Sequence, residues 1–290
     1  MGRPHDSNVK VFAVDIGGSY AKYAIVTIDG KIEKKGKIET GYNSNPEEVL
    51  KRIDGIKGKE KVAIAVAGTI KDGVIINSPN LPNWENYDIK SYFGDITIEN
   101  DANASAYGEW YWKEKNRRIL VYLAIGTGIG GGVVVDGDIF RGMGVATELG
   151  HMVIDKEGRR CRCGNKGCLE SMASSYFLEE RSLEIFGKKI PPKKLAYLAK
   201  KNKKAKSIFR ELGRNLGVGV SNISNIFNPE IIVIGGGIAN SYHLFQSSMI
   251  EEYNKRVLSA TKCKIKNSEL GDLSGVLGIA ALHFKFSEPL

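Results

Sequence analysis

Three apolar runs separated by short turns open the chain. KVFAVDI (10–16), YAKYAIVTI (20–28) and KIEKKGKI (31–38) have the apolar content of β-strands, and the turns GGS and DG join them. A strand followed at once by a glycine turn and a second strand predicts an antiparallel meander. A dinucleotide-binding unit would have a helix between its first two strands, so this opening excludes that class of fold.

From residue 46 onward, helical and strand-like patterns alternate. The start Pro46-Glu47-Glu48 predicts a helix, because proline and acidic residues are frequent in the first helical turn. A buried strand, a helix, a strand and a further helix are then predicted over 61–68, near 86–93, over 95–100 and over 102–114.

A second strand, glycine turn and strand follow the polar segment KEKNRR. ILVYLAIG (119–126), the turn TGIGGG and GVVVDG (132–137) repeat the opening of the chain, which indicates a weak internal duplication. A long helical segment at about 205–226, the strand EIIVIG (230–235), a further helix and a last strand near 262–267 complete this half.

Two α/β domains that face each other across a cleft are the architecture that this pattern predicts. We expect the smaller domain to comprise residues 1–114 together with 276–290, because the apolar helix GVLGIAALHF (275–284) is expected to pack back on it. Residues 115–275 then form the larger domain, which carries a cysteine-rich loop.

The composition is that of an ordinary globular protein. Of the 290 residues, 42% are hydrophobic and 26% are charged. No stretch approaches the length of about 18 uncharged apolar residues that a membrane-spanning helix needs. The N-terminus, MGRPHDSNVK, has no apolar run, and Asp6 stands where a myristoylation signal requires Ser or Thr. We therefore expect a cytoplasmic protein with no membrane partner.

Much of the formal charge of +9 lies in one lysine-rich segment, KKIPPKKLAYLAKKNKKAK (188–206). Its lysines are spaced around Ile190, Leu195, Leu198 and Ala205, which predicts the solvated faces of two amphipathic helices. The segment contains no nucleic-acid-binding motif, so we expect no nucleic-acid partner.

Three glycine-rich turns each follow an apolar strand directly. They are DIGGS (15–19), GTGIGGG (126–132) and GGG (235–237). Glycine serves any turn that needs a positive φ, so one such turn alone says little about function. Three turns in equivalent positions favour phosphate binding, because bare backbone N–H groups can approach phosphate oxygens closely.

Two carboxylates lie beside predicted strand ends. Asp15 comes just before Gly17, where it either positions the magnesium ion of a nucleotide or only caps its own turn. Asp101 follows the strand DITIEN at the start of a helix, so it is either a reactive carboxylate or a helix cap.

Three of the four cysteines lie within eight positions, in CRCGNKGCLE. Cys161, Cys163 and Cys168, with His151 ten positions before the first, form the Cys₃His set of a tetrahedral structural zinc site. A disulfide is the alternative, but it would leave one thiol over in a reduced compartment. Four protein ligands leave no position for water, which argues against a zinc hydrolase. Cys263 lies in a predicted strand, where we expect a core residue.

Seven motifs in sequence order resemble those of the ROK family of sugar kinases, repressors and related proteins. They are DIGGS, SPNLPNW (78–84), ENDANASAYGE (99–109), GTGIGGG, ELGH (148–151), CRCGNKGCLE and IVIGGGIA. The resemblance covers essentially the whole chain from residue 10. It implies an α/β protein with the two-domain, actin-like ATPase fold, which is ribonuclease H-like and has a cleft between its domains.

The resemblance implies a kinase that transfers the γ-phosphate of ATP to the 6-hydroxyl of a hexose. Asp101 would be the general base that accepts the hydroxyl proton, and Asp15 would help to bind Mg²⁺ beside the phosphates. The residues implied to contact the phosphates are Gly17, Gly18, Ser19, Thr127 and Gly128, and those under the nucleoside are Gly235 and Gly236.

The resemblance also implies which residues bind the sugar. His151 would use one ring nitrogen for zinc and offer the other to a sugar hydroxyl. Glucose, mannose and their amino or N-acetylamino derivatives share the hydroxyl pattern that this set would contact. The implied sugar-binding residues are Gly68, Asn80, Asn100, Asp101, Glu148, His151 and Glu170.

The chain departs from the family pattern at three positions. Ser19 stands where the first glycine turn usually has threonine, and Ala67 stands where proline is frequent. Thr147 precedes Glu148 where glycine is common. These changes concern loop geometry and sugar choice, and they leave the residues implied in phosphoryl transfer intact.

The alternative function is a sugar-sensing regulator of the same family without kinase activity. Such repressors carry a helix-turn-helix domain before the sugar-binding fold, and the first strand here begins near Val9, which leaves no room for one. A sensor also needs no general base, whereas Asp101 is present. We therefore expect an enzyme with sugar and ATP as its ligands and, as in many ROK proteins, a homodimer or homotetramer.

Overall fold

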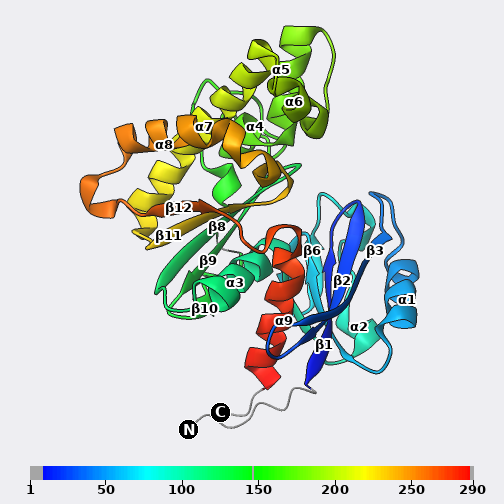
Figure 1. Cartoon of the computed structure of the whole chain (residues 1–290). Coiled ribbons are helices and arrows are strands. Elements are labelled where there is room, and N and C mark those ends of the chain that lie inside the picture. Colours follow the sequence, from blue (N-terminus) through cyan, green and yellow to red (C-terminus); the bar gives the residue numbers. More distant parts are fainter. Residues whose placement is uncertain (1–8, 146, 288–290) are drawn as a thin grey trace. The chain divides into compact units, whose positions relative to one another are not determined.

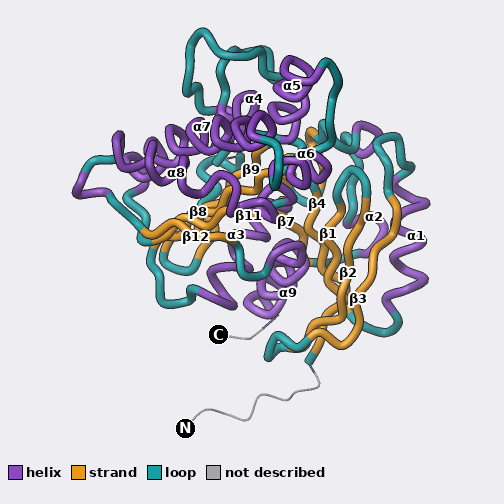
Figure 2. Tube along the Cα trace, turned by 45° about the horizontal axis from the view of Figure 1, so that its top comes forward, coloured by secondary structure: helices purple, strands orange, loops and turns teal. Residues whose placement is uncertain are grey.

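The computed structural model describes residues 9–145 and 147–287 as a mixed α/β chain (Figure 1). The ends of the predicted smaller domain, residues 1–8 with Asp6 and 288–290, lie outside the described residues. The strands, orange in Figure 2, are β1 (Lys10–Ile16), β2 (Tyr20–Thr27), β3 (Ile32–Glu39), β4 (Lys61–Val66), β5 (Thr69–Lys71), β6 (Val74–Asn77), β7 (Thr97–Asn100), β8 (Ile119–Ile125), β9 (Ile129–Val135), β10 (Asp138–Ile139), β11 (Ile231–Gly235) and β12 (Lys264–Asn267). The α-helices, purple in Figure 2, are α1 (Pro46–Lys57), α2 (Lys90–Phe93), α3 (Asp101–Lys113), α4 (Leu169–Ala173), α5 (Ser175–Phe186), α6 (Pro192–Ala199), α7 (Lys203–Phe227), α8 (Tyr242–Arg256) and α9 (Ser274–Ser287).

The chain divides into two compact units. Among the described residues, unit 1 comprises 9–116, 132–145 and 272–287, and unit 2 comprises 117–131 and 147–271. The domain bounds expected from the sequence stay a prediction. The units differ from them chiefly in the segment 132–145, which belongs to unit 1.

The two five-stranded sheets have the same strand order. One runs β3-β2-β1-β4-β7 and the other runs β10-β9-β8-β11-β12. In the first sheet β1 is antiparallel to β2 and parallel to β4, and in the second β11 is parallel to both β8 and β12. This equivalence agrees with the internal duplication that the two strand-turn-strand openings indicate.

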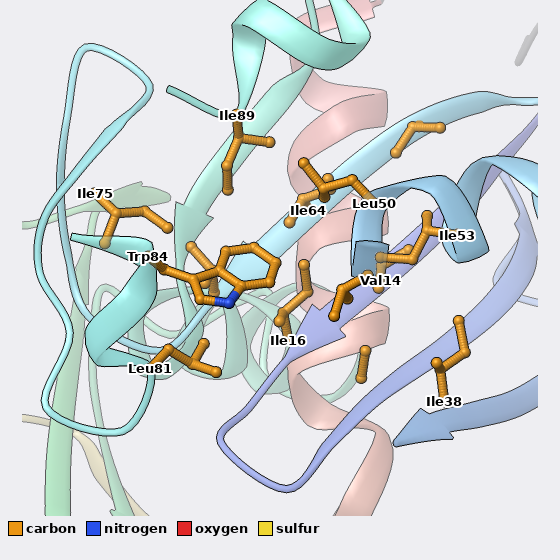
Figure 3. Packing of buried hydrophobic residues seen from close by; sticks show 14 of the residues in the cluster. Val14, Ile16, Ile38, Leu50, Ile53, Ile64, Ile75, Leu81, Trp84 and Ile89 are labelled. Atoms are coloured by element: carbon orange, nitrogen blue, oxygen red, sulfur yellow. The ribbon is translucent and has the colours of Figure 1, made fainter. Parts of the chain in front are cut away.

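The sheet of unit 1 is covered on both faces. On one face Val14 and Ile16 of β1 are fully buried in a cluster with Leu50 of α1 (Figure 3). Asp15 points to the other face, where Gly275 of α9 lies beside it. Helix α9 packs on β1, β4 and α3, which confirms that the C-terminal helix returns to the first strands.

Helix α7 is the central helix of unit 2. Its buried positions recur every three or four residues, as in Leu212, Leu216, Val220 and Ile223, and it packs on α4, α5, α6 and α8. The predicted helix over about 205–226 is confirmed as Lys203–Phe227. Among the helices that the structure describes, none has the length and apolar character needed to cross a membrane.

The lysine-rich segment falls on α6 and the start of α7, as predicted. Leu195 and Ala205 are fully buried, and Ile190 is buried as well. The expectation for Leu198 is wrong, because 39% of this residue is exposed. Helix α6 packs through Leu195 and Ala199, which are one turn apart, and Leu198 falls on the flank of that stripe.

The predicted helix near 86–93 is wrong for its first half. Asn86 has a φ of 61°, and its N–H donates to Ile75 O at 2.7 Å. Asp88 forms a bridge with Val74, so these residues join the hairpin β5–β6, and helix α2 begins only at Lys90. Neither this hairpin nor the helices α4 and α5 were predicted from the sequence.

Candidate functional site

Three parallel strands of unit 1 end in register. Ile16 pairs with Val66, and Val66 pairs with Asn100, so β1, β4 and β7 end at one edge of the sheet. Ligands of open α/β sheets bind at the carboxyl ends of the strands. The predicted residues Gly17, Gly18 and Gly68 lie in the turns after β1 and β4, and Asp101 directly follows β7 as the first residue of α3.

The turn after β1 packs against the segment that contains Asn80. Gly17 O accepts a hydrogen bond from Thr40 Oγ1 at 2.6 Å, which holds the turn in place. A Cβ added to Gly18 would lie 2.7 Å from Asn80 O. Gly18 therefore allows a close approach between the predicted phosphate turn and a predicted sugar-binding residue, whereas Ser19 is exposed.

The turn after β4 requires glycine at position 68. Gly68 has a φ of 134°, and an added Cβ would lie 2.5 Å from Asn77 O. Ser78 Oγ donates to Ala67 O at 2.6 Å, so the segments 67–68 and 77–78 lie side by side. Ala67, which stands where the family often has proline, thus takes part in this contact through its carbonyl oxygen.

Asn100 is the N-cap of helix α3, and Asp101 is its first residue. Asn100 Oδ1 accepts hydrogen bonds from the N–H groups of Ala102 (2.9 Å) and Asn103 (3.0 Å). Asn100 Nδ2 donates to Gly68 O at 3.0 Å and to Asp101 Oδ1 at 3.1 Å. The alternative in which Asp101 is the helix cap is therefore wrong, and the Asn100 amide holds the Asp101 carboxylate.

Asp15 lies on β1 with its carboxylate in a region of negative charge. Burial and the Asp101 carboxylate raise the pKa of Asp15 to about 7, and Lys22 acts in the opposite direction. Mg²⁺ is commonly bound by one or two carboxylates together with substrate phosphates. The donor set of unit 1 therefore fits the magnesium ion of a nucleotide.

We expect Asp15→Asn to stabilise the protein at pH 8 in the absence of nucleotide and magnesium. The carboxyl ionises near 3.8 in the unfolded chain and near 7 in the folded one, so its ionisation costs stability as pH rises from about 4 to 7. The melting temperature of the variant should match that of the wild type at pH 4 and exceed it by roughly 10 °C at pH 8.

The control for this prediction is Asp29→Asn. A hydrogen bond from Thr27 lowers the pKa of Asp29, so its replacement should give a shift of opposite sign. Melting curves at several pH values test both variants, and an Asp15→Asn difference that is independent of pH would contradict the raised pKa.

In unit 2, β8 and β11 are parallel and end at the same level, since Gly235 pairs with Ala124. The turn after β8 contains the predicted residues 127–128. The turn after β11 contains Gly236, which has a φ of 80° and where an added Cβ would lie 2.5 Å from Ile125 O. The two predicted nucleotide-binding turns of unit 2 therefore lie at one edge of its sheet.

Glu170 joins one of these turns to the cysteine cluster. Glu170 Oε2 accepts a hydrogen bond from Ile129 N at 2.9 Å, and an added Cβ on Gly128 would lie 2.2 Å from the same oxygen. The Cys161 thiol lies 3.8 Å from Glu170 Oε1 and can donate to it. Glu170, predicted as a sugar ligand, is thus also a brace for the turn at Gly128, which the sequence did not indicate.

The predicted zinc ligands His151, Cys161, Cys163 and Cys168 are brought together. Their four ligand atoms all lie within 4.8 Å of one another. Cys163 Sγ is 3.6 Å from Cys168 Sγ, and Cys161 Sγ is 3.7 Å from His151 Nδ1. Tetrahedral zinc with its usual bond lengths separates such ligand atoms by about 3.5 to 3.8 Å, so the set fits zinc.

Burial favours the neutral form of two thiols in this cluster. Burial, followed by the hydrogen bonds with Cys163 and Cys161, raises the pKa of Cys168 to about 12, and burial raises the pKa of Cys161. Metal-bound cysteines are thiolates, so a divalent ion has to supply the charge that stabilises them. Cys263 lies apart from this cluster, beside Tyr253 and Ser224.

His151 presents its two ring nitrogens to different neighbours. Nδ1 faces Cys161, and Nε2 lies 3.9 Å from Glu148 Oε2. Glu148 is exposed, with 59% of its side chain accessible. Thr147 before it has a φ of 74°, a conformation that favours glycine, and its hydroxyl donates to Gly131 O at 3.0 Å. The Nε2 atom is therefore the one that remains for a sugar hydroxyl if Nδ1 binds metal.

Each unit holds part of the predicted set. The ion pair between Glu99 and Arg141 adjoins Asn100 in unit 1. The sequence did not predict this pair, because its two residues are 42 positions apart and no local pattern relates them. The members in unit 1 are Asp15, Gly17, Gly18, Ser19, Gly68, Asn80, Asn100 and Asp101. The members in unit 2 are Thr127, Gly128, Glu148, His151, Cys161, Cys163, Cys168, Glu170, Gly235 and Gly236.

A recess of about 800 Å³ in unit 1 lies away from this edge. Its lining includes Lys61 and Thr97, at the amino ends of β4 and β7, together with His283 of α9. None of the predicted site residues lines it. The recess is therefore separate from the candidate site, which lies at the carboxyl ends of the same strands.

Comparisons with known proteins find relatives that match nearly the whole chain. The family model described as ROK family matches residues 11–285. The glucokinase of Thermotoga maritima is 31% identical over 307 aligned residues, which cover 94% of this chain and 97% of that protein. The xylose repressor of Bacillus subtilis is 37% identical over 293 aligned residues, which cover 93% of this chain and 75% of the repressor.

A solved structure supports the same relation. A ROK family glucokinase from Streptomyces griseus, in complex with glucose and AMPPNP, aligns with a TM-score of 0.82 and 26% identity. The alignment covers 95% of this chain and 99% of that one. The similarity thus extends over both units rather than over one of them.

Proposed function

From the premise that this chain belongs to the ROK family, we propose that it is an ATP-dependent sugar kinase. The expected fold class is confirmed, since its structural relatives are ROK sugar kinases with the two-domain, actin-like ATPase fold. The observation that carries the proposal is the position of Asp101 at the end of β7, held by Asn100, at the same sheet edge as the turn after β1.

Asp101 is the general base of the proposed reaction. Its carboxylate accepts the proton of the sugar 6-hydroxyl as that oxygen attacks the γ-phosphate of ATP. Phosphoryl transfer requires positioning and charge stabilisation more than covalent catalysis, so one carboxylate at the nucleophile is sufficient. Its place in the first turn of α3 suits a negative charge, because the helix dipole is positive there.

The nucleotide is held mainly by backbone groups of the glycine turns. The turns after β1 and β8 would offer the N–H groups of Gly18, Ser19, Thr127 and Gly128 to phosphate oxygens. The Gly17 N–H donates to Tyr20 O at 3.0 Å, so Gly17 would contribute to the phosphate site by shaping the first turn. Gly235 and Gly236 would lie under the nucleoside, and their missing side chains allow Tyr122 and Ile125 to pack close to this turn. Asp15 would hold Mg²⁺, which when bound neutralises charge on the phosphates.

The sugar is recognised by side chains that can accept hydrogen bonds from its hydroxyls. Glu148 and Glu170 accept hydrogen bonds from hydroxyls, and His151 contributes Nε2 while Nδ1 faces the metal site. Structural zinc held by the four ligands would keep His151 and the cysteine loop in one arrangement. Gly68, Asn80 and Asn100 complete the set from unit 1.

An ADP-release assay across a panel of hexoses tests the proposal. Glucose, mannose, N-acetylglucosamine and N-acetylmannosamine are each offered with ATP and magnesium, and the sugar product is analysed for a 6-phosphate. We expect at least one sugar to stimulate ADP release strongly, and release should stop when magnesium is chelated. No stimulation by any sugar in zinc-loaded protein would contradict the kinase.

The similarity to the xylose repressor of Bacillus subtilis favours one second candidate, a sugar-responsive regulator. A regulator would bind sugar without turnover. Titration calorimetry on the same panel separates the two functions, because sugar binding without ADP release supports the regulator.

A cytoplasmic location, the absence of a nucleic-acid partner and a homodimeric or homotetrameric state stay predictions.

Substitutions at Glu170 separate its two proposed roles. Glu170→Gln keeps an oxygen that can accept from Ile129 N but loses the negative charge that strengthens hydrogen bonds from sugar hydroxyls. We expect this variant to raise KM for sugar about 10-fold while KM for ATP changes less than about 3-fold. Glu170→Ala also removes the brace and should raise both constants. Equal effects of the two variants on KM for ATP would contradict the bracing role.

A further inference from the structure

Glu99 of β7 is a nearly buried carboxylate, with 8% of the residue exposed. Its Oε2 accepts two hydrogen bonds from one guanidinium, from Arg141 Nε at 3.0 Å and Nη2 at 2.5 Å. Its Oε1 accepts from Asn100 N at 3.0 Å and Asn103 Nδ2 at 3.1 Å. One buried side chain thus connects the segment after β10 to the first turn of α3.

The same contacts lead directly to Asp101. Asn100 donates from its side-chain amide to Asp101 Oδ1 and to Gly68 O, while its Oδ1 caps α3. Glu99 accepts the backbone N–H of Asn100, and the side-chain amide of Asn100 binds Asp101 Oδ1 together with Ala102 N at 2.9 Å. A continuous chain of hydrogen bonds therefore runs from Arg141 through Glu99 and Asn100 to the proposed base.

Arg141 is suited to fix the orientation of Glu99. A buried carboxylate is costly unless a charge partner and further hydrogen bonds satisfy it, and Glu99 has both. Both bonds from the rigid guanidinium converge on Oε2 and fix the position of that oxygen, while Asn100 N and Asn103 Nδ2 fix the position of Oε1. Arg141 itself is partly exposed, with 41% of its side chain accessible, so its replacement leaves no cavity in the core.

We propose that Arg141 and Glu99 are a positioning pair that aligns Asp101 for proton transfer. The inference rests on the proposed kinase function and goes beyond it, because neither residue belongs to the predicted sugar or nucleotide set. The pair acts through Asn100 and does not touch the substrate. Its loss should therefore lower kcat far more than it changes KM for sugar.

The test compares Glu99→Gln and Arg141→Gln with wild type in steady-state kinetics. A displacement of a reacting group by about 1 Å can cost on the order of 100-fold in rate, so we expect kcat to fall about 10- to 100-fold. KM for sugar should stay within about 3-fold. The double variant should be little worse than either single one, because both substitutions disrupt the same chain of hydrogen bonds. Arg141→Lys should restore part of the rate.

The matched control is a second ion pair of the same geometry in unit 2. Arg181 donates to Glu211 Oε2 from Nε at 3.0 Å and from Nη2 at 2.8 Å, and it also pairs with Glu184. Among the described contacts, neither Arg181 nor Glu211 itself touches a predicted site residue. Arg181→Gln and Glu211→Gln should leave kcat within about 2-fold of wild type. If Glu99→Gln and Arg141→Gln behave like these controls, the positioning role is wrong.

A structural readout keeps this inference separate from the kinase proposal. Hydrogen exchange reports the amides of Ala102 and Asn103, which the Asn100 cap binds. Exchange should be at least about 10-fold faster in Glu99→Gln than in Glu211→Gln, because loss of the brace weakens the cap. A wild type that releases no ADP would refute the kinase, and unchanged exchange in Glu99→Gln would refute the positioning pair.

Discussion

Replacement of Asp101 by asparagine is expected to lower kcat by about 10²- to 10⁴-fold, the usual range for loss of a general base. The amide has the shape of the carboxylate and keeps an oxygen for the hydrogen bond from Asn100, so the first turn of α3 should be preserved. An amide cannot accept the hydroxyl proton at neutral pH. KM for sugar and sugar affinity by calorimetry should therefore stay within about 3-fold of wild type.

The control for Asp101→Asn is Asp95→Asn. Asp95 is exposed and lies just before β7, at the other end of the strand from the proposed base. Its replacement should leave both kinetic constants unchanged. Full activity of Asp101→Asn would remove the proposed base, and loss of sugar binding in this variant would show that Asp101 serves binding instead.

Replacement of Cys163 by serine is expected to have the largest effect on stability. A hydroxyl is a poor zinc ligand at neutral pH, and the free energy of binding a structural metal contributes to folding. A loss of about 4 kcal/mol corresponds to a fall of roughly 10 °C in Tm for a domain of this size. Metal analysis should find substoichiometric zinc, and KM for sugar should rise because His151 loses its fixed orientation.

Cys263→Ser is the matched control, since Cys263 is a free cysteine outside the cluster. This variant should keep one zinc per chain and a sugar KM close to that of wild type. Chelation of the wild type should reproduce the phenotype of Cys163→Ser, and added zinc should reverse it. Wild type that contains no zinc and takes up none would refute the metal site.

Local sequence patterns were sufficient for the main elements. The strand-turn-strand openings predict β1–β2 and β8–β9, because an apolar run, a glycine turn and a second run within a few residues can form only a local pairing. The regular spacing of apolar positions predicts α7, because this spacing is also a local property of the sequence. The cysteine spacing likewise indicates a metal site, since three ligands lie within one short loop.

Elements that depend on distant partners were missed. Residues 86–88 have no strong strand pattern and are ordered by pairing with β6, so a helix was predicted in their place. The exposure of Leu198 depends on which side of α6 packs against its neighbours. The alternation of lysines and apolar residues does not show which flank of this helix is buried.

The roles of individual site residues divide in the same way. The identities of Asp101 and Glu170 as candidate carboxylates follow from motifs, because each stands beside a recognisable turn or cluster. Only the folded chain shows that Asn100 caps α3, that Glu170 accepts a hydrogen bond from Ile129 N, and that Arg141 binds Glu99. Two of these contacts join segments that are far apart in the sequence, and the third depends on which of two neighbouring residues caps the helix. Local sequence patterns determine neither.

Sequence periodicity and residue chemistry were thus enough for the main elements and the predicted metal-ligand set, because these depend on short-range spacing, and the resemblance to the ROK family indicated Asp101 as the candidate base. The folded chain was needed for the register that aligns the ends of β1, β4 and β7, and for the hydrogen bonds that orient Asp101. Register and side-chain orientation depend on burial and pairing between segments far apart in the chain, and that information is tertiary.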